Sequence, residues 1–480
     1  MSRWLVLLLG SLLGLLLPLG AMGAGFPQLE RMVERGFLIS AEAKLLDSGE
    51  VLGAIEPQRQ LSPASVSKAY LAAATLDRWG PQHRFTTRLV SDAELNGTGV
   101  VTGDLILDGG GDPALTTEDL WRLAQRLHQR GVREVEGRLV VSQWRFGPVE
   151  CITTDRCQAQ TRTANAYSAL LSSAGVNYGS WCVTVVPGAA AGQPALITSC
   201  DSQTTIVGID NHVETQPPNS GTELNAERVT RENGDVMVLR GQISLNASPR
   251  EVYRASSDPA QQTARTMMAM LEQAGIAVRQ GYSTSVEEPP AAARILATVD
   301  GKPLQELLLR TMNYSNNFMA DVLALNLVDM PRSSLLQAGD AIEHYVAGLP
   351  DHGPLIMHSG SGLTTENRTS AQGSNILLDS MFHRTALFPS FVASFQSPAN
   401  GVSHFIRRGS PTFQNHVMLK TGTLNQPFAV RSVSGYFRTL SGRWGAFSVL
   451  VNGTATTPWL NWAQVLDPLA DDLERMIEAH

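Results

Sequence analysis

The chain has 480 residues, which is long for a single domain, so two or three domains are expected. Hydrophobic residues make up 43% of the sequence and charged residues 17%, which is typical of a soluble globular protein. The formal net charge of -7 at pH 7 argues against nucleic acid as a partner.

The N-terminus has the pattern of a secretory signal peptide. Arg3 gives a short positive start, the run Trp4–Leu17 is almost wholly apolar, and small residues follow at Gly23 and Ala24, where cleavage is expected. An uncleaved membrane anchor is the alternative, but the apolar run is short for a full span. We therefore expect an exported protein.

Predicted helices and strands alternate irregularly along the rest of the chain, and the segment from about 150 to 250 combines short strands with many turn residues. In chain order we expect a hairpin at 36–56, a helix at 65–79, a strand at 99–108, a helix at 117–130, a strand at 137–141, a helix at 258–275, helical patterns at 303–328, strands at 417–420, 431–437 and 444–451, and a helix at 458–479.

The four cysteines lie close together in the middle of the chain. In an exported protein, such clustering favours two disulfides over free thiols, and three pairings are open. We favour Cys151–Cys157 and Cys182–Cys200, because each pair closes a short local loop. A zinc site is the alternative, but no Cys-x-x-Cys pair is present and no histidine lies at ligand spacing.

The first motif with chemical meaning is Ser65-Val66-Ser67-Lys68, at the start of a predicted helix. A serine hydroxyl needs a base within hydrogen-bond reach to act as a nucleophile. Residues three apart share a helix face, so Lys68 is expected to lie beside Ser65. A buried lysine loses its proton readily and can be that base. Alone the motif is weak, since Ser-x-x-Lys is common on capped surface helices.

The second motif is Ser315-Asn316-Asn317. In a loop that joins two helices, Ser315 and Asn317 can both face a cleft. Ser315 is a candidate to pass a proton to a leaving amine, and Asn317 to hold Lys68 and a substrate peptide group. Clusters of serine and asparagine are usually loops or helix caps, so this motif is also weak alone.

The third motif is Lys420-Thr421-Gly422-Thr423, after the apolar run Val417–Leu419. A strand edge at this point can pair with an extended peptide. Gly422 removes a side chain where a substrate backbone must approach. Lys420 offers a positive charge to a terminal carboxylate.

All three motifs, in this order behind a signal peptide, resemble the set found in serine β-lactamases and penicillin-binding proteins. The gap from Ser65 to Ser315 is far too long for a simple β-lactamase, so the chain resembles the class C low-molecular-mass penicillin-binding proteins, which are D-alanyl-D-alanine carboxypeptidases/endopeptidases. Further stretches that match this family are Pro63–Ser65, Leu107–Pro113, Val135–Val140, Gly360–Leu363 with Asn367–Arg368, Leu419–Leu424 and Ser434–Tyr436.

The resemblance implies an acyl-enzyme mechanism without a cofactor or a metal. Ser65 would be the nucleophile and Lys68 its base, and Ser315 would help to protonate the leaving amine. The substrate would be held by Asn317, Lys420, Thr421 and Thr423, and the backbone amides of Ser65 and Thr423 would form the oxyanion hole. Peptidoglycan stem peptides would be the substrates and β-lactams the inhibitors, in the periplasm. Three properties are left open: the preference between carboxypeptidase and endopeptidase activity, the oligomeric state, and a peripheral association with the membrane.

The same resemblance implies an α+β fold. A transpeptidase-like domain, with an antiparallel sheet flanked by helices, would carry a large strand-rich insertion that forms two smaller domains. The expected ranges are 1–24 for the signal peptide, 25–84 with 300–480 for the catalytic domain, 85–107 with 192–299 for inserted domain II, and 108–191 for inserted domain III.

The sequence departs from the family after Gly360-Ser361-Gly362-Leu363. Members often have Ser-Arg at the positions of Thr364 and Thr365, and that arginine helps to recognise the stem-peptide side chain. Members also often have Asp at the position of Ser359. The stem-peptide preference is therefore not predicted.

Other classes of protein fit the sequence less well. A β-lactamase needs fast deacylation, and no extra glutamate base motif is evident near Ser315. A histidine-based serine hydrolase would place His358 beside Ser359 and Ser361, but no Gly-x-Ser-x-Gly elbow is present. A metallopeptidase would need His-Glu-x-x-His, which is missing. A non-catalytic wall-binding protein predicts decay of the motif set, yet the set is complete.

Overall fold

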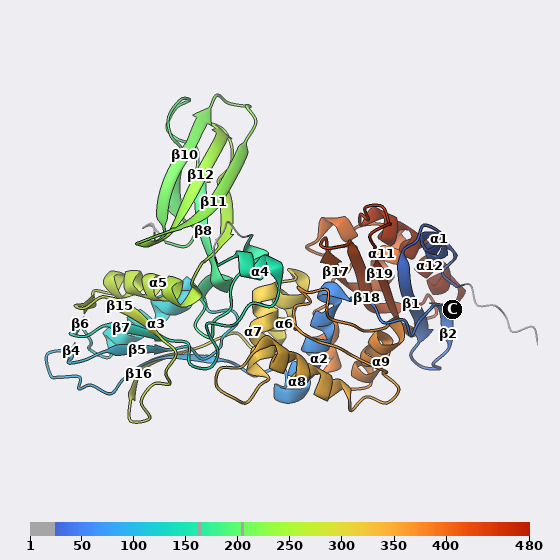
Figure 1. The fold of residues 1–480 in the computed structure, drawn as a ribbon, viewed down its shortest axis with the longest axis horizontal. Coiled ribbons are helices and arrows are strands. Elements are labelled where there is room, and N and C mark those ends of the chain that lie inside the picture. The colour runs from blue at the N-terminus through green and yellow to red at the C-terminus, as the bar shows by residue number, and fades with distance from the viewer. Residues whose placement is uncertain (1–24, 161–164, 203–205) are drawn as a thin grey trace, which may run out of the picture.

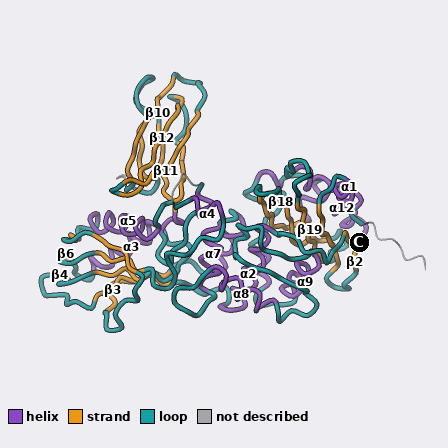
Figure 2. Tube along the Cα trace, in the orientation of Figure 1, coloured by secondary structure: helices purple, strands orange, loops and turns teal. Residues whose placement is uncertain are grey.

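The computed structural model describes residues 25–160, 165–202 and 206–480, so the predicted signal peptide lies outside the described residues. Figure 1 shows a helix-rich body around one sheet, a second sheet with helices beside it, and a narrow group of strands that stands away from both. Figure 2 shows how helices gather around the first sheet, while strands and loops dominate the rest.

The first body is built on a five-stranded antiparallel sheet with strand order β17-β18-β19-β1-β2. Almost every residue of the central strands β18 and β19 is buried, because helices cover both faces of the sheet, and this explains the nearly continuous apolar run of β19. β17 forms one edge. The strands span β1 (Leu38–Leu45), β2 (Val51–Ile55), β17 (Val417–Leu424), β18 (Val430–Arg438) and β19 (Trp444–Asn452).

Helices pack on the two faces of this sheet and form two cores. One core includes Phe37, Val433 and Leu469 and lies under α1 (Pro27–Glu34), α11 (Pro411–His416) and α12 (Ala463–Ala479). The other core includes Tyr70, Phe391 and Tyr436. It lies among α2 (Ser67–Trp79), α6 (Leu304–Asn313), α7 (Asn317–Asn326), α8 (Leu335–Val346), α9 (Ala371–Phe382) and α10 (Phe388–Val392).

Helix α2 is the central helix of this body. Every residue from Ser67 to Leu76 is buried, because α6, α7, α8 and α9 all pack against it. A helix that is buried all round needs small and apolar residues, and the run Ala72-Ala73-Ala74 meets this need. The 3₁₀ turn η1 (Ala64–Val66) leads directly into α2 and lies against β17.

The second body lies between α2 and α6 in the chain and has a mixed sheet of order β15-β7-β5-β3-β16, with a small sheet β14-β6-β4 beside it. Two helices pack on each other and on this sheet, around a core that includes Leu107, Leu123 and Met267. The elements are β3 (Thr86–Ser91), β4 (Val100–Val101), β5 (Leu105–Asp108), α3 (Thr117–Gln129), β6 (Glu134–Val135), β7 (Leu139–Ser142), α5 (Pro259–Gln273), β14 (Ala277–Val278), β15 (Tyr282–Ser285) and β16 (Arg294–Asp300).

The strands that stand apart in Figure 1 form the sheet β10-β12-β11, which shares a core around Trp181, Val213 and Leu239 with the sheet β13-β8-β9. Short helices α4 (Thr154–Gln158), η2 (Ala166–Ser168) and η3 (Val176–Gly179) precede them. The strands span β8 (Ser180–Val186), β9 (Leu196–Ser199), β10 (Gly208–Gln216), β11 (Glu223–Arg231), β12 (Gly234–Ser244) and β13 (Arg250–Ala255).

Both predicted disulfides are confirmed. Cys151 is bonded to Cys157 around α4, and Cys182 on β8 is bonded to Cys200 just after β9. Disulfides persist in oxidising environments, so the chain works outside the cytoplasm. Among the described residues, no helix has both the length and the apolar character needed to cross a bilayer.

Most predicted elements are confirmed, including the hairpin at 36–56, the two helices joined by a loop at Ser315 and the three strands near the C-terminal end, but three boundaries were wrong. The helical pattern at 303–328 is two helices, because Ser315 takes a left-handed φ of 52° and Asn316 caps the second helix by accepting a hydrogen bond from the Met319 amide at 2.9 Å. The strand at 99–108 breaks between Val101 and Leu105, the helix at 65–79 starts as a 3₁₀ turn, and the final helix begins only at 463.

Strand pairing groups the insertion differently from the predicted ranges. β7, from the predicted range 108–191, pairs in parallel with β5 and with β15, which come from the other inserted range. The middle sheets instead use a continuous run of chain, from β8 to β13. The domain boundaries stay a prediction, and this pairing favours a division after β7 and before α5.

Asp472 on α12 links the two ends of the first body. Its carboxylate is fully buried and accepts the amides of Gln28 and Leu29, which lie in the first turn of α1, at 3.1–3.2 Å. These amides have no partner within the helix, so the carboxylate satisfies them.

We expect Asp472→Ala to destabilise the protein by about 1 kcal/mol, the usual cost of losing such a cap. Thermal unfolding, followed by tryptophan fluorescence, should show a lower midpoint. Asp472→Asn, which keeps an acceptor oxygen, is the matched control. Its unfolding midpoint should lie between those of the parent and of Asp472→Ala. An alanine variant as stable as the parent would contradict this role.

Candidate active site

Ser65 lies at a strained turn that opens toward solvent. It is the middle residue of η1, and the residue before it, Ala64, has a left-handed φ of 46°. Such a conformation costs a non-glycine residue about 1–2 kcal/mol and persists because the surroundings hold it. Gly362 is part of those surroundings, since a Cβ at this position would lie 1.9 Å from the Ala64 carbonyl oxygen. Ser65 is half-buried, while its neighbours on both sides are buried.

Lys68 is fully buried one turn further along, and its ammonium group has three neutral partners. Nζ donates to Ser65 Oγ at 2.9 Å, to Asn317 Oδ1 at 2.7 Å and to the Ser361 carbonyl oxygen at 2.7 Å. Burial lowers the pKa of Lys68 well below its usual value, and the charge of Lys420 lowers it further. The arrangement places an amine with a lowered pKa beside a hydroxyl group.

Ser315 and Lys420 form a second pair on the other side of the site. Lys420 Nζ donates to Ser315 Oγ at 2.9 Å and to the Thr421 carbonyl oxygen at 2.7 Å. Lys420 is 1% exposed, and burial lowers its pKa to about 7. The left-handed backbone at Ser315 turns this residue out of the end of α6 toward β17.

Asn317 begins α7 and connects the site to the insertion. Its side-chain oxygen accepts from Lys68, and its side-chain nitrogen donates to the Tyr167 carbonyl oxygen at 3.0 Å. Tyr167 lies in η2 of the insertion and is half exposed. The amide can fill both roles because it has a donor end and an acceptor end.

β17 presents a free edge beside Ser65. Within the described ranges, its outer side is paired only near its start, where the main chains of Leu419 and Gln396 exchange two hydrogen bonds. Because alternate residues of a strand direct their main-chain groups to the same side, those of Thr421 and Thr423 also face this edge. Thr421 is buried and Thr423 is exposed. The structure thus brings Ser65, Lys68, Ser315, Asn317 and Lys420 together, with the two threonines along the strand edge.

Sequence reasoning missed the polar residues behind Lys68. The Asp321 carboxylate is fully buried and accepts from the Ser359 hydroxyl at 2.9 Å and from the Ser361 amide at 2.8 Å. Arg156, 2% exposed, donates to the same carboxylate at 2.8 Å. One signal was available: Asp321 is the only charged residue within the apolar helix α7, four positions after Asn317 and so on the same face.

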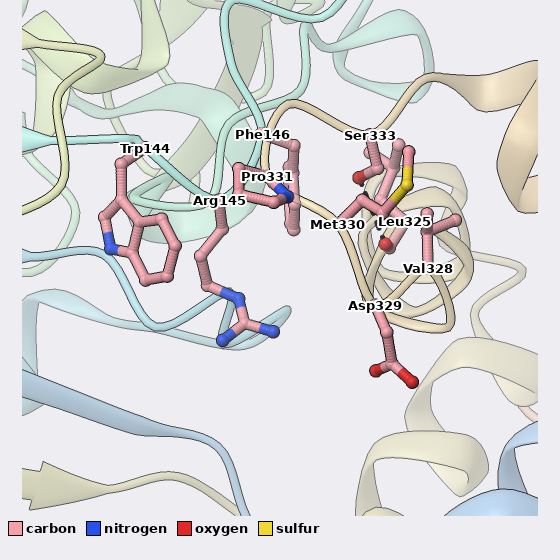
Figure 3. A pocket seen from close by; sticks show the side chains of 9 residues that line it. All are labelled: Trp144, Arg145, Phe146, Leu325, Val328, Asp329, Met330, Pro331 and Ser333. Carbon is pink, nitrogen blue, oxygen red and sulfur yellow. Dashed lines mark hydrogen bonds between the residues drawn. The ribbon is translucent and has the colours of Figure 1, made fainter.

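A cavity of about 240 Å³ lies elsewhere, where the loop after β7 meets the end of α7, and Figure 3 shows its lining side chains. Arg145 and Asp329 point toward the same open side of it. Asp329 also pairs with Arg78 of α2. None of the candidate catalytic residues lines this cavity, so it belongs to the junction between the insertion and the first body.

Comparisons with known proteins identify relatives of the chain. The chain is 28% identical over 420 residues to the D-alanyl-D-alanine carboxypeptidase of Actinomadura sp. (strain R39), covering 85% of this chain and 76% of the relative. It is 23% identical over 451 residues to the D-alanyl-D-alanine carboxypeptidase DacB of Haemophilus influenzae, covering 89% and 88%.

The fold matches that of solved penicillin-binding proteins. The crystal structure of penicillin-binding protein 4 from Haemophilus influenzae superposes with a TM-score of 0.76 at 19% identity, covering 94% of this chain and 99% of that one. The predicted α+β architecture is therefore confirmed. The model of the D-Ala-D-Ala carboxypeptidase 3 (S13) family matches residues 28–473. The chain therefore belongs to the D-Ala-D-Ala carboxypeptidase 3 (S13) family of serine-type D-alanyl-D-alanine carboxypeptidases/endopeptidases.

Proposed function

We propose that the chain cleaves peptidoglycan stem peptides or their cross-links, with Ser65 as the nucleophile and Lys68 as its base. The observation that carries this proposal is the 2.9 Å contact between Lys68 Nζ and Ser65 Oγ, made by a lysine that is fully buried. Burial disfavours the ammonium form, so the amine can take the serine proton.

In the acylation step, Ser65 Oγ forms a bond to the carbonyl carbon of the penultimate D-alanine while its proton passes to Lys68. The carbon–nitrogen bond of the peptide then breaks, and the leaving amine takes up a proton. Ser315 is placed for that transfer, because its hydroxyl lies 2.9 Å from the Lys420 ammonium group, which can replace the proton. Water attacks the ester in the second step and frees Ser65.

The substrate would lie along the free edge of β17 as an extra strand. Lys420 supplies a positive charge for a terminal carboxylate, with Thr421 and Thr423 beside it, and the Asn317 amide can hold the peptide group. The backbone amides of Ser65 and Thr423 would receive the oxyanion. Such a pair of preorganised donors is worth several kcal/mol in comparable enzymes, about 3–4 per donor removed.

Close contact between β17 and η1 is what this oxyanion hole requires. A Cβ at Gly422 would lie 2.4 Å from the Pro63 carbonyl oxygen and 2.8 Å from the Ser65 amide nitrogen. Both are backbone atoms, so no side-chain rotation can relieve the clash. Glycine at this position therefore lets the strand edge reach the nucleophile.

β-Lactams would act as inhibitors by forming a long-lived ester with Ser65. Penicillin-binding protein 4 from Haemophilus influenzae, which shares this fold, was solved in complex with a β-lactam. We place the protein in the periplasm, because the N-terminal segment has the pattern of a signal peptide and the stem peptides are found there. A peripheral association with the membrane is compatible with this location.

We expect a fluorescent penicillin to label the purified mature protein stably and to leave Ser65→Ala unlabelled. Label retention followed over time on gels is the measurement. Ser48→Ala, in the exposed turn between β1 and β2, is the control and should label like the parent. Rapid loss of label would move the protein to the β-lactamases, and an unlabelled parent would contradict the proposal.

We expect the second-order rate constant for labelling to have a bell-shaped dependence on pH. The rate should rise as Lys68 loses its proton and fall as Lys420 loses its own, with the pKa of Lys420 at about 7. In Lys420→Ala the falling limb should disappear. The rising limb should move to higher pH, because the charge that lowers the pKa of Lys68 is gone. A rising limb that stays in place would contradict the coupling.

We expect Gly422→Ala to slow acylation by roughly 10²-fold, the scale of a misplacement of about 1 Å between reacting groups. Penicillin labelling kinetics measure it. Gly97→Ala is the matched control, because a Cβ at this surface glycine meets no atom within 4 Å. Equal rates in the two variants would show that β17 and η1 need not touch.

A further inference from the structure

An arginine from the insertion lies at the back of the catalytic centre. Arg156, in α4, is 2% exposed, and its guanidinium donates to the fully buried Asp321 at 2.8 Å and to the Ala169 carbonyl oxygen at 3.1 Å. The remaining guanidinium nitrogen, Nη2, is buried and makes no hydrogen bond in the part of the chain that the structure describes. Because the guanidinium is shielded from solvent, its charge is compensated by Asp321.

Asp321 in turn fixes the residue that holds Lys68. Its Oδ1 accepts the Ser361 amide at 2.8 Å, and the Ser361 carbonyl oxygen accepts from Lys68 Nζ at 2.7 Å. Asp321 is also one turn after Asn317, the second partner of Lys68. Arg156, Asp321 and Ser361 thus form a continuous chain of contacts that ends at the proposed base.

The charges explain why the arginine is needed. A buried carboxylate close to Lys68 favours its ammonium form, and an ammonium ion cannot accept the serine proton. With a guanidinium bound to it, the carboxylate keeps its hydrogen bonds to the loop at Ser361 while its charge is balanced. Breaking a buried pair by removing one partner leaves an uncompensated charge, which is far more harmful than removing both.

The loop that carries Arg156 is held at both ends. The disulfide Cys151–Cys157 encloses it, with the arginine next to the second cysteine. Two residues after that cysteine, the Ala159 carbonyl oxygen accepts a hydrogen bond from Arg228 of β11. A five-residue helix such as α4 has little stability of its own, so these restraints are what keep the arginine in place.

We propose that Arg156 is a positioning residue for the reaction: seated by the Cys151–Cys157 loop, it balances Asp321 so that Ser361 and Lys68 stay in the arrangement that activates Ser65. The insertion therefore completes the catalytic centre from behind. This inference rests on the proposed function, in which Lys68 is the base.

The electrostatic directions agree with the geometry. Burial and the charge of Lys420 lower the pKa of Lys68, the Asp321 carboxylate raises it, and Arg156 lowers it. Lys420, which also acts on Lys68, comes from β17 and is kept in every variant. The pH at which the acylation rate rises therefore depends directly on whether the charges of Asp321 and Arg156 balance each other.

The test measures penicillin labelling rates against pH in four variants. In Arg156→Met the rising limb should move up by about one pH unit or more, the usual effect of a nearby uncompensated charge. In Asp321→Asn it should move down, because the arginine charge is then unbalanced. In Arg156→Met/Asp321→Asn it should return toward the parent, and in Arg156→Lys it should stay near the parent. Unchanged limbs in both single variants, or a double variant displaced as far as Arg156→Met, would overturn the proposal.

Two features keep this test decisive. If Arg156→Met does not fold, the comparison between Asp321→Asn and the double variant still gives the sign. Failure of the proposed function has a different signature, since the parent itself would then take no label.

The role of the disulfide is tested in the same way. Cys151→Ser/Cys157→Ser should move the rising limb in the same direction as Arg156→Met. Cys182→Ser/Cys200→Ser, which opens the link between β8 and β9, should leave it in place. If the rising limb of Cys151→Ser/Cys157→Ser stayed at the pH found for the parent, the role given to the disulfide would be overturned.

Discussion

The arrangement of this protein depends on one buried amine whose direct partners are all neutral. In the described part of the chain, Lys68 donates to a hydroxyl, an amide and a carbonyl oxygen, and to no carboxylate. A carboxylate in direct contact would fix the proton on the amine, while an apolar pocket would leave the amine without orientation. The three acceptors come from η1, α7 and the loop at Ser361, so the fold must bring these distant segments to one point. The central position of α2, buried on all sides, makes this convergence possible.

Charge is needed near the site but is kept one step away from the amine. On one side, Lys420 lies behind Ser315 and lowers the pKa of Lys68. On the other side, the pair of Arg156 and Asp321 stabilises the loop that supports Lys68. Lys420 donates to Ser315 and Asp321 accepts from Ser361, and both also act on the pKa of Lys68 through their charge. The backbone contributes too, since Ser65 and Ser315 both lie at left-handed turns, at Ala64 and at Ser315 itself.

The sequence allowed the motif residues, the sheet strands at the C-terminal end and both disulfides to be predicted, because each depends on local spacing or on the order of motifs. The loop at Ser315 between two helices was expected from its serine and asparagine residues, but its left-handed backbone could not be read from the residue pattern. Arg156 and Asp321 were missed for another reason. They lie 165 positions apart, and no periodicity or spacing rule links an arginine in a disulfide loop to an acid in a distant helix. The grouping of strands in the insertion could not be read from the sequence for the same reason. β7 pairs with strands from both ends of the insertion, which are far apart in the sequence.

The order of strands in the first body also governs when the enzyme can become active. β1 lies between β2 and β19, so the strand made first cannot complete its pairing until the one made last is available. The contact between α1 and Asp472 spans 444 positions for the same reason. In a chain made from its N-terminus, Ser65 and Lys68 are therefore present long before β17. Until β17 pairs with β18, the proposed nucleophile lacks the strand that would supply half of the proposed oxyanion hole, so the proposed activity requires the nearly complete chain.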